Sequence, residues 1–377
     1  MRSLEQAREV CERHVPGLYP ALASIPLSDL EAPGNSGLEL FRKFGGPALV
    51  IPAEYAGRGV SPVEALQVTR AIGACAPSLS VATTMHHFSV ATIFALATSL
   101  RASGVEWALL EGISEQNLLV ASGFAEGDPG AGILTPTLRG VVRDGGIVVN
   151  GAKKPCSMSA SMDLLSASVS VATPDGDATS VVLVPASTPG LSVHPFWASI
   201  VLTGAESDEV RLTDVVIDER LVVPAGAGDR GELDDLQTTG FIWFEMLITA
   251  CYLGMASALV ERVFSGPRSS VEQRAELGIR LETAALLLEG IAQAIATGRT
   301  GNDDLARALV ARYGAVDAIR DVVVRATEAL GGMAFITDPD VAYLAAACQC
   351  AAFHPPSRSA TSAALAANLS GDVLRIE

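Results

Sequence analysis

Aromatic and charged residues are both scarce in this chain of 377 residues. Phe, Trp and Tyr make up 5% and Asp, Glu, Lys and Arg 18%, whereas apolar residues make up 49%. A chain this apolar is not disordered, and a core short of aromatic rings must be built largely from Ala, Val and Leu. Because such side chains let helices approach closely, we expect a helix-rich, heavily buried protein of two or three packed units.

Positive charge is also in short supply. Lys and Arg number 26 against 42 Asp and Glu, which gives a formal net charge of −16. An acidic protein repels nucleic acid phosphates, and no stripe of Lys and Arg offsets the charge, so nucleic acid is excluded as a partner. The same charge disfavours acidic carrier proteins unless a local basic patch exists.

Metal-binding and targeting patterns are missing from the sequence. The six cysteines form no C-x-x-C pair and no metal-like cluster with the five histidines, so we interpret them as small buried residues in a reducing cytosol. No N-terminal segment resembles a signal peptide, and charges or Gly interrupt the longest apolar stretches. We therefore expect a cytoplasmic protein without a membrane span or a metal.

Three regions of different periodicity follow one another along the chain. Before about residue 118, apolar residues recur every three or four positions, as in "LEQAREVCERHV", which predicts helices. The next hundred residues alternate with a period of two and carry turn dipeptides such as Asp144–Gly145, as in a small barrel or sandwich. Helical periodicity returns after about residue 232 in long stretches that predict an antiparallel bundle.

The predicted fold class is therefore α+β but mainly α. We expect an N-terminal helical domain at 1–118, a middle small β-barrel domain at 119–222 and a C-terminal four-helix bundle at 223–377.

Five strings, in a fixed order, resemble segments of the acyl-CoA dehydrogenase superfamily. "IPAEYAGRGVSPVEALQVTRAIG" resembles the family's N-terminal stretch, and "GFAEGDPGAG" and "NGAKKPCSMS" resemble two segments of its middle domain. "SDEVRLTDVVIDERLVV" resembles a later strand pair, and "EALGGMAFITDPDVAYL" a Gly-Gly segment with the strand-like approach to the active site. The resemblance covers nearly the whole chain and agrees with the predicted fold class.

The resemblance implies a flavoenzyme. The family binds FAD between the barrel and the bundle and oxidises acyl thioesters between Cα and Cβ. A carboxylate removes the Cα proton while a hydride passes to the flavin. The implied substrate is an acyl or aminoacyl group carried on coenzyme A or a carrier protein, in a specialised pathway, and the implied assembly is a homodimer or homotetramer.

Two segments of the middle region carry the implied flavin contacts. An ungapped alignment puts Gly127 where relatives have a flavin-contacting Thr, and leaves the backbone N–H groups of the following loop to approach the cofactor. Ser157 falls at the hydroxyl residue that faces flavin N5, and Pro155 falls where an aromatic ring covers the flavin. Without the resemblance, these segments are an ordinary turn and a strand-end loop. The loop consists of Pro129, Gly130, Ala131 and Gly132.

A third segment near the C-terminus matches the family's Gly-Gly pair. Glu328, Gly331 and Gly332 align with a segment that reaches the cofactor of a neighbouring subunit. The string "EALGG" is equally typical of a helix C-terminus.

Pro355 stands where many relatives place the catalytic Glu, and proline cannot accept a proton. His354, next to it, and Glu245, on the first long C-terminal helix, are the candidate bases. The family's alternative position for the base aligns with Phe244, and one helical step turns a side chain by about 100°. His354 is equally a loop donor, and Glu245 equally a carboxylate favoured near a helix start.

The Arg–Phe–Gly segment, whose Arg contacts the FAD pyrophosphate in relatives, is absent, with Arg268 or Arg274 as replacements for its charge. Three functions remain open. The first is a thioester oxidoreductase with a relocated or absent base. The second is a flavin monooxygenase of the same fold, which needs no such base. The third is a non-redox enzyme that cyclises or cleaves a thioester, or a degenerate partner subunit.

Overall fold

The computed structural model describes residues 1–99, 102–127, 136–173, 176–224 and 234–376. Its N-terminal part is helical. Helices α5 and α6 both begin with Pro, whose missing N–H is no loss at that position, and Ser61 and Glu64 form a capping box on α5. The helices are α1 Arg2–His14, α2 Leu18–Ala23, α3 Leu27–Leu30, α4 Gly37–Lys43, α5 Pro62–Cys75, α6 Pro77–Ala97 and α7 Val105–Gln116.

The middle part is a single sheet with the strand order β6-β7-β3-β2-β4-β5-β8, and β1 pairs with β4 beside that path. Strands β1 and β2 run parallel to β4, and the other pairs are antiparallel. Gly145, at φ +81°, turns the chain between β2 and β3, where a turn dipeptide was predicted. The strands are β1 Val120–Gly123, β2 Arg139–Arg143, β3 Gly146–Cys156, β4 Leu164–Thr173, β5 Gly176–Pro185, β6 Leu191–His194, β7 Asp208–Asp218 and β8 Val222–Pro224.

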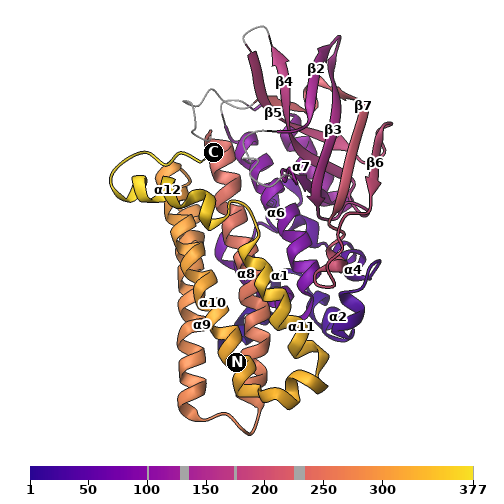
Figure 1. The fold of residues 1–377 in the computed structure, drawn as a ribbon. Coiled ribbons are helices and arrows are strands. Elements are labelled where there is room, and N and C mark those ends of the chain that lie inside the picture. The colour runs from indigo at the N-terminus through magenta and orange to yellow at the C-terminus, as the bar shows by residue number, and fades with distance from the viewer. Residues whose placement is uncertain (100–101, 128–135, 174–175, 225–233, 377) are drawn as a thin grey trace.

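The C-terminal part is helical again, and this order of helices, sheet and helices confirms the predicted fold class. Figure 1 shows α8, α9 and α10 running side by side away from the sheet, with α12 across the end nearer the sheet. The helices are α8 Asp235–Ser265, α9 Val271–Ala296, α10 Asn302–Thr337, α11 Pro339–Ala347 and α12 Arg358–Leu369.

The stretch predicted to approach the active site as a strand is helical instead. Gly331, at φ +83°, breaks α10 near its end, and the chain then continues as helix to Thr337. Asp338 accepts a hydrogen bond from the Asp340 N–H and so caps α11. Local capping chemistry therefore outweighs the strand-like pattern of this stretch.

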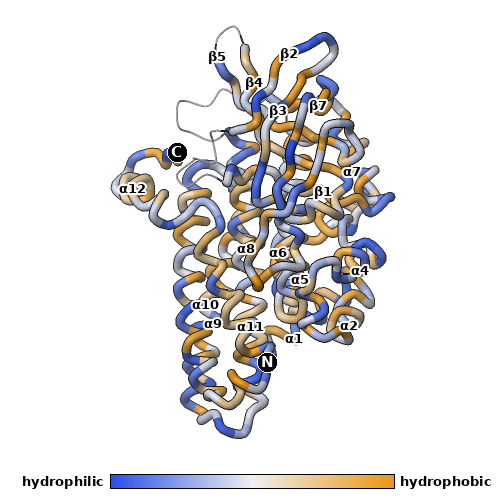
Figure 2. Tube along the Cα trace, turned by 45° about the vertical axis from the view of Figure 1, so that its right-hand side comes forward, coloured by the Kyte–Doolittle hydropathy of each residue, from blue (hydrophilic) through white to orange (hydrophobic). Residues whose placement is uncertain are grey.

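Helix α8 is the centre of the core and contacts α5, α6, α9 and α10. Glycines bring α5 and α8 together, because a Cβ at Gly254 would lie 2.3 Å from the Arg70 carbonyl oxygen and one at Gly73 would lie 2.5 Å from that of Cys251. Helices α6 and α8 are long and apolar enough to cross a membrane, but most of their residues are buried inside the protein. Figure 2 shows these hydrophobic segments enclosed by the other helices, so we interpret both as core helices.

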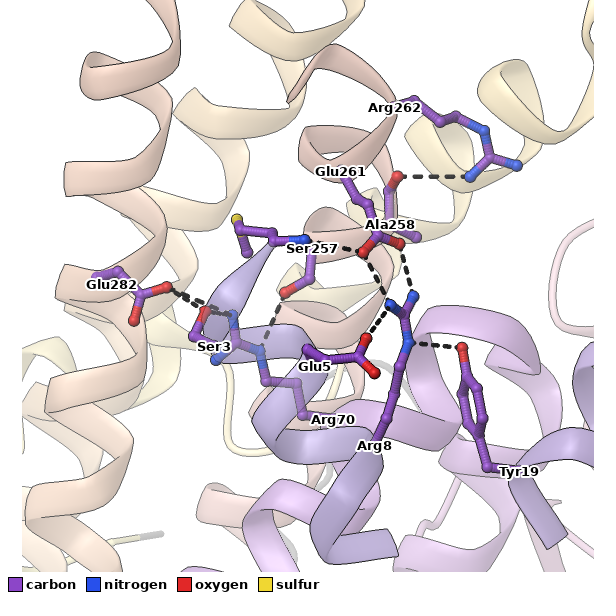
Figure 3. Close-up of polar contacts among 11 residues, drawn as sticks. Ser3, Glu5, Arg8, Tyr19, Arg70, Ser257, Ala258, Glu261, Arg262 and Glu282 are labelled. Atoms are coloured by element: carbon purple, nitrogen blue, oxygen red, sulfur yellow. Dashed lines mark hydrogen bonds and ion pairs between the residues drawn. The ribbon is translucent and has the colours of Figure 1, made fainter. Parts of the chain in front are cut away.

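A cluster of polar contacts joins α1 and α5 to α8 (Figure 3). Arg8 on α1 donates from Nη1 to Glu261 Oε1 at 2.8 Å and from Nη2 to Oε2 at 2.5 Å, and its Nε donates to the Tyr19 hydroxyl at 2.7 Å. Arg70 on α5 is buried and donates from Nε to the Ser257 hydroxyl at 3.0 Å. These contacts hold the N-terminal helices against the bundle.

We expect Glu261→Gln to lower the free energy of unfolding by about 1–2 kcal/mol, because it removes the charge from a bidentate, half-buried pair. Although burial opposes it, the hydrogen bond from Arg8 lowers the pKa of Glu261. The contribution is therefore present above the ordinary carboxyl range and is lost as the pH falls through the lowered pKa. Urea unfolding at neutral and acidic pH measures both effects.

Glu5→Gln is the matched control, since Glu5 contacts the same guanidinium at 3.1 Å but is 60% exposed. We expect it to cost about 0–0.5 kcal/mol. Equal losses for the two variants would contradict the role of Glu261.

Candidate functional site

A buried ion pair joins α8 to α10 in the bundle core. Arg312 Nη1 lies 2.6 Å from Glu245 Oε2, and the two side chains are 2% and 0% exposed. Burial raises the pKa of Glu245 to about 7, against the opposing charge of Arg312. The other carboxylate oxygen, Oε1, is buried and has no hydrogen-bond partner among the described residues. Glu245 is therefore the buried partner that balances the charge of Arg312.

The same Arg312 holds the loop that contains Pro355. Its Nη2 donates to the His354 carbonyl at 2.7 Å, and its Nη1 lies 3.4 Å from the carbonyl oxygens of Pro355 and Pro356. The neighbouring Tyr313 hydroxyl donates to the Pro356 carbonyl at 3.0 Å. One end of α10 thus fixes the backbone of the loop where relatives place their base.

Arg312 was not among the residues predicted from the sequence. Its only signal was a lone Arg within the apolar stretch "ALVARYGAV", and that position is buried on α10. A cation in such a stretch must find a buried anion or several carbonyl groups, and Arg312 finds both.

His354 points its ring toward α8. Its Nε2 is in hydrogen-bond contact with the Tyr252 hydroxyl, and its ring lies edge-on to Phe244 with the centroids 6.2 Å apart. Burial, with the charge of Arg312, lowers the pKa of His354 to about 3. His354 is therefore neutral at physiological pH. The structure brings both candidate bases to one cluster, in which the ring of His354 packs against that of Phe244, and a basic role for either stays a prediction.

A row of aromatic rings connects this loop to the sheet. Phe244 packs edge-on against Phe88 of α6 with the centroids 5.4 Å apart, and Phe88 lies 6.2 Å from Phe124, which directly follows β1. Phe88 and Phe124 are only partly buried. The row runs along the junction of the N-terminal helices, the sheet and the bundle. It gives this junction an apolar wall.

Ser157 follows directly after β3 on the sheet side of the junction. It is nearly buried, and its hydroxyl lies 3.0 Å from the hydroxyl of Ser207, a partner that the sequence did not reveal. Pro155 is partly buried two residues earlier and has no ring to lay over a flavin in the way an aromatic residue does.

Gly127 lies against the same strand end. Its φ is +72°, and a Cβ there would lie 2.4 Å from Lys154 Cγ, so this position requires glycine. Two uncharged hydroxyls, an exposed glycine and an aromatic ring three residues before that glycine, Phe124, are groups of the kind that suit the polar edge and flat face of a flavin ring. Pro129, Gly130, Ala131 and Gly132, the rest of the predicted contact, lie outside the described residues.

We expect Gly127→Ala to weaken flavin binding and to lower the free energy of unfolding by about 1–3 kcal/mol, because the Cβ both strains the backbone and meets Lys154. Gly145→Ala is the control. Gly145 has a similar φ of +81°, but a Cβ at this position would meet no atom within 4 Å. If both variants retain flavin equally and differ little in stability, the contact with Lys154 has no importance.

The third predicted flavin contact, the segment with the Gly-Gly pair, lies far along α10 from the other two. Glu328 and Gly332 are exposed and Gly331 is half-buried on the end of α10 that points away from the sheet (Figure 1). Glu328 lines a hollow between α9 and α10 together with Gln273, Glu276 and Arg325. Within one chain, the structure does not bring this segment to Ser157 or His354, and contact with a neighbouring subunit's cofactor stays a prediction.

The chain is similar to known proteins over its full length. It is 46% identical to isobutylamine N-hydroxylase of Streptomyces viridifaciens over 378 residues, which cover 100% of both chains. It is 28% identical over 227 residues to YdbM, a provisionally named acyl-CoA dehydrogenase of Bacillus subtilis (strain 168), covering 59% of this chain and 55% of that one. No protein-family model matches.

Solved structures share the fold. KijD3, in complex with FMN and an amino-keto-sugar nucleotide, has a TM-score of 0.84 and 18% identity, over 97% of this chain and 94% of KijD3.

Proposed function

Because this chain belongs to the acyl-CoA dehydrogenase-like superfamily, we propose that it is a flavin-dependent monooxygenase that hydroxylates the nitrogen of a small primary alkylamine. The chain is an enzyme. Its full-length similarity to isobutylamine N-hydroxylase supports the reaction and the substrate class.

The observation that carries this proposal is the pairing of Glu245 with Arg312. Thioester desaturation requires a carboxylate that is free to remove a Cα proton. Here Pro355 stands at the usual position. The carboxylate nearby, Glu245, is 0% exposed and lies 2.6 Å from Arg312, which also holds the loop, so it is buried away from a substrate. Oxygen transfer to an amine nitrogen breaks no Cα–H bond. The site therefore suits oxygenation better than the thioester oxidation that the family resemblance implied.

Each part of the junction has a role in this reaction. When bound, a reduced flavin would supply the two electrons with which dioxygen gives one oxygen atom to the amine nitrogen and the other to water. The hydroxyls of Ser157 and Ser207 lie 3.0 Å apart and would hold the polar edge of the flavin ring. Phe88, Phe124 and Phe244 exclude water and offer an apolar surface to the alkyl group.

We propose FAD as the flavin, following the family resemblance, with FMN as the alternative. FMN is the alternative because it has no pyrophosphate for the absent Arg–Phe–Gly segment to contact, and because the similar KijD3 structure contains FMN. Melting curves of the protein with FAD and with FMN at equal concentration distinguish the two, because the flavin that binds more tightly raises the melting temperature more. A cytoplasmic homodimer or homotetramer also remains our proposal, and light scattering measures the assembly.

The experiment for the proposed function mixes the flavin-loaded, chemically reduced protein with isobutylamine and oxygenated buffer. We expect at most one equivalent of the hydroxylamine for each equivalent of reduced flavin that is oxidised. In a parallel anaerobic titration, the oxidised flavoprotein is mixed with acyl thioesters and should keep its absorbance. Bleaching by a thioester, without hydroxylamine in the first experiment, would show a dehydrogenase instead.

We expect Ser157→Ala to weaken flavin binding about 3–10-fold, equivalent to one neutral hydrogen bond. Ser207→Ala should have a smaller effect if Ser207 acts only by orienting Ser157. Fluorescence titration with flavin measures both. If Ser157→Ala leaves the dissociation constant and the flavin spectrum unchanged, Ser157 does not belong to the site.

A further inference from the structure

We propose that His354 works as a neutral hydrogen-bond donor from Nδ1, that Tyr252 sets this state, and that the enzyme consequently takes its amine in the uncharged form. This inference rests on the proposed function for its substrate but not for the state of the histidine. It replaces the expectation that His354 is the base of this site.

The Tyr252 hydroxyl determines which nitrogen of His354 carries the proton. Tyr252 lies in the middle of α8 and is 1% exposed. Among the described residues, the only hydrogen-bond partner of its hydroxyl is His354 Nε2. A buried hydroxyl hydrogen without an acceptor costs about 1–3 kcal/mol, so Tyr252 donates to Nε2. The opposite arrangement, with the proton on Nε2, would leave the tyrosine hydrogen unpaired.

This donation fixes the tautomer of His354. With the Nε2 lone pair engaged, a neutral imidazole carries its proton on Nδ1 and presents a donor there. Protonation of Nε2 would also break the bond from Tyr252 and add a cation beside Arg312, which bonds the His354 carbonyl at 2.7 Å. Nδ1–H can therefore hold an oxygen acceptor at the junction, but Nε2 is not free to accept a proton from a substrate.

The charged and titratable groups around His354 favour the same state. Burial raises the pKa of Tyr252 well above its ordinary value, so its hydroxyl keeps its proton. Among the described residues of this cluster, Arg312 is the cation, and the acidic group beside it, Glu245, is bonded to it. The groups that face His354 or its hydroxyl partner from α8, α10 and the adjoining turn are Glu245, Tyr252, Arg312, Tyr313, Cys348 and Cys350.

The consequence for catalysis concerns the substrate's proton. An alkylammonium ion has no lone pair with which to attack an oxygen atom. Among the described residues, His354 Nε2 is occupied by the Tyr252 hydroxyl, and the Glu245 side chain is 0% exposed and paired with Arg312, so neither candidate base is open to a substrate's proton. The neutral amine is then the reactive species. The enzyme recruits it from the small neutral fraction in solution.

Nitrogen NMR of the full-length protein labelled with ¹⁵N-histidine tests the first part. The chain has five histidines, and His354→Gln assigns the signal. We expect the Nδ1–H tautomer at neutral pH, and in Tyr252→Phe a shift toward the Nε2–H tautomer. Tyr313→Phe is the control, because Tyr313 bonds the Pro356 carbonyl and not the imidazole. A wild-type signal from Nε2–H or from the imidazolium overturns the proposal, whatever the protein's activity.

The pH profile of kcat/KM for the amine tests the second part. We expect it to rise about tenfold per pH unit from pH 7 toward the pKa of the free amine, with the same slope in Tyr252→Phe. A plateau that begins near neutral pH would reveal a base on the enzyme and overturn the assignment. If the NMR signal is as expected but no amine is hydroxylated, the proposed function fails while the state of His354 stands.

Discussion

Arg312→Met is expected to lower the free energy of unfolding by about 3–5 kcal/mol, because it leaves a buried carboxylate without its cation. The pair is 2% and 0% exposed, so water cannot replace the lost partner without opening the bundle. The loss also frees the His354 carbonyl, which Arg312 bonds at 2.7 Å. The loop that carries His354 should therefore loosen together with the core.

The effect of this variant should depend on pH with a definite sign. The pKa of Glu245 is raised to about 7 by burial, so the protonated carboxyl is the form that the fold favours. That contribution is complete below the ordinary carboxyl range and is lost as the pH rises through the folded-state value. Without Arg312 to oppose burial, the folded-state pKa rises further. We expect Arg312→Met to be much less destabilising at pH 5 than at pH 8.

Two further variants isolate the ion pair. Arg358→Met removes an exposed arginine that contacts Asp317 at 2.8 Å, and it should cost less than about 1 kcal/mol. Combining Glu245→Met with Arg312→Met should recover much of the loss, since neither member of the pair then leaves an unpaired charge between α8 and α10. Urea unfolding of the three variants provides the measurement. A loss for Arg312→Met no larger than that for Arg358→Met would contradict the account.

Lys153→Met should lower the free energy of unfolding by about 3 kcal/mol and weaken flavin binding in parallel. Lys153 on β3 is 1% exposed, pairs with Glu126 and donates to the Ser168 hydroxyl at 3.0 Å. Glu126 also accepts from the Thr137 N–H at 2.9 Å, and it directly precedes Gly127. The variant therefore leaves a buried carboxylate unpaired next to the predicted flavin contact.

Lys154→Met is a control at the adjacent position. Lys154 is 33% exposed and lies 3.8 Å from Glu209, and methionine keeps the Cγ that faces Gly127. We expect a loss below about 1 kcal/mol and unchanged flavin affinity. Thermal melts with and without flavin measure both variants. Similar losses at both positions would show that the buried pair with Glu126 is unimportant.

The sequence predicted the parts of this fold that depend on local pattern. Stretches in which apolar residues recur every three or four positions are helices in the structure. Asp144–Gly145 is a turn, as predicted, and Gly145 has the positive φ that glycine adopts readily. The prediction of a strand-like stretch after Gly331 was wrong, because the chain continues as helix after the break at Gly331 and a new helix begins at the cap residue Asp338. Capping of this kind is local, but its outcome depends on what each helix packs against.

The pairings at the site could not be predicted in the same way. Glu245 and Arg312 are 67 residues apart, so their contact depends on the packing of α8 against α10. Tyr252 and His354 are 102 apart, and their contact depends on the packing of α8 against the loop that contains Pro355. The sequence placed Glu245 and His354 among the candidates by type and alignment. Only the packing shows that one is bonded to a buried cation and the other to a buried hydroxyl.

The most direct test of the central claim uses ¹⁸O-labelled dioxygen. Flavin-loaded, reduced enzyme is mixed with isobutylamine under labelled gas in unlabelled water, and the product is analysed by mass spectrometry. We predict a hydroxylamine in which one oxygen atom, derived from dioxygen, is bonded to nitrogen. Unaltered amine, together with an unsaturated product from an acyl thioester incubated with the oxidised flavoprotein, would contradict the account.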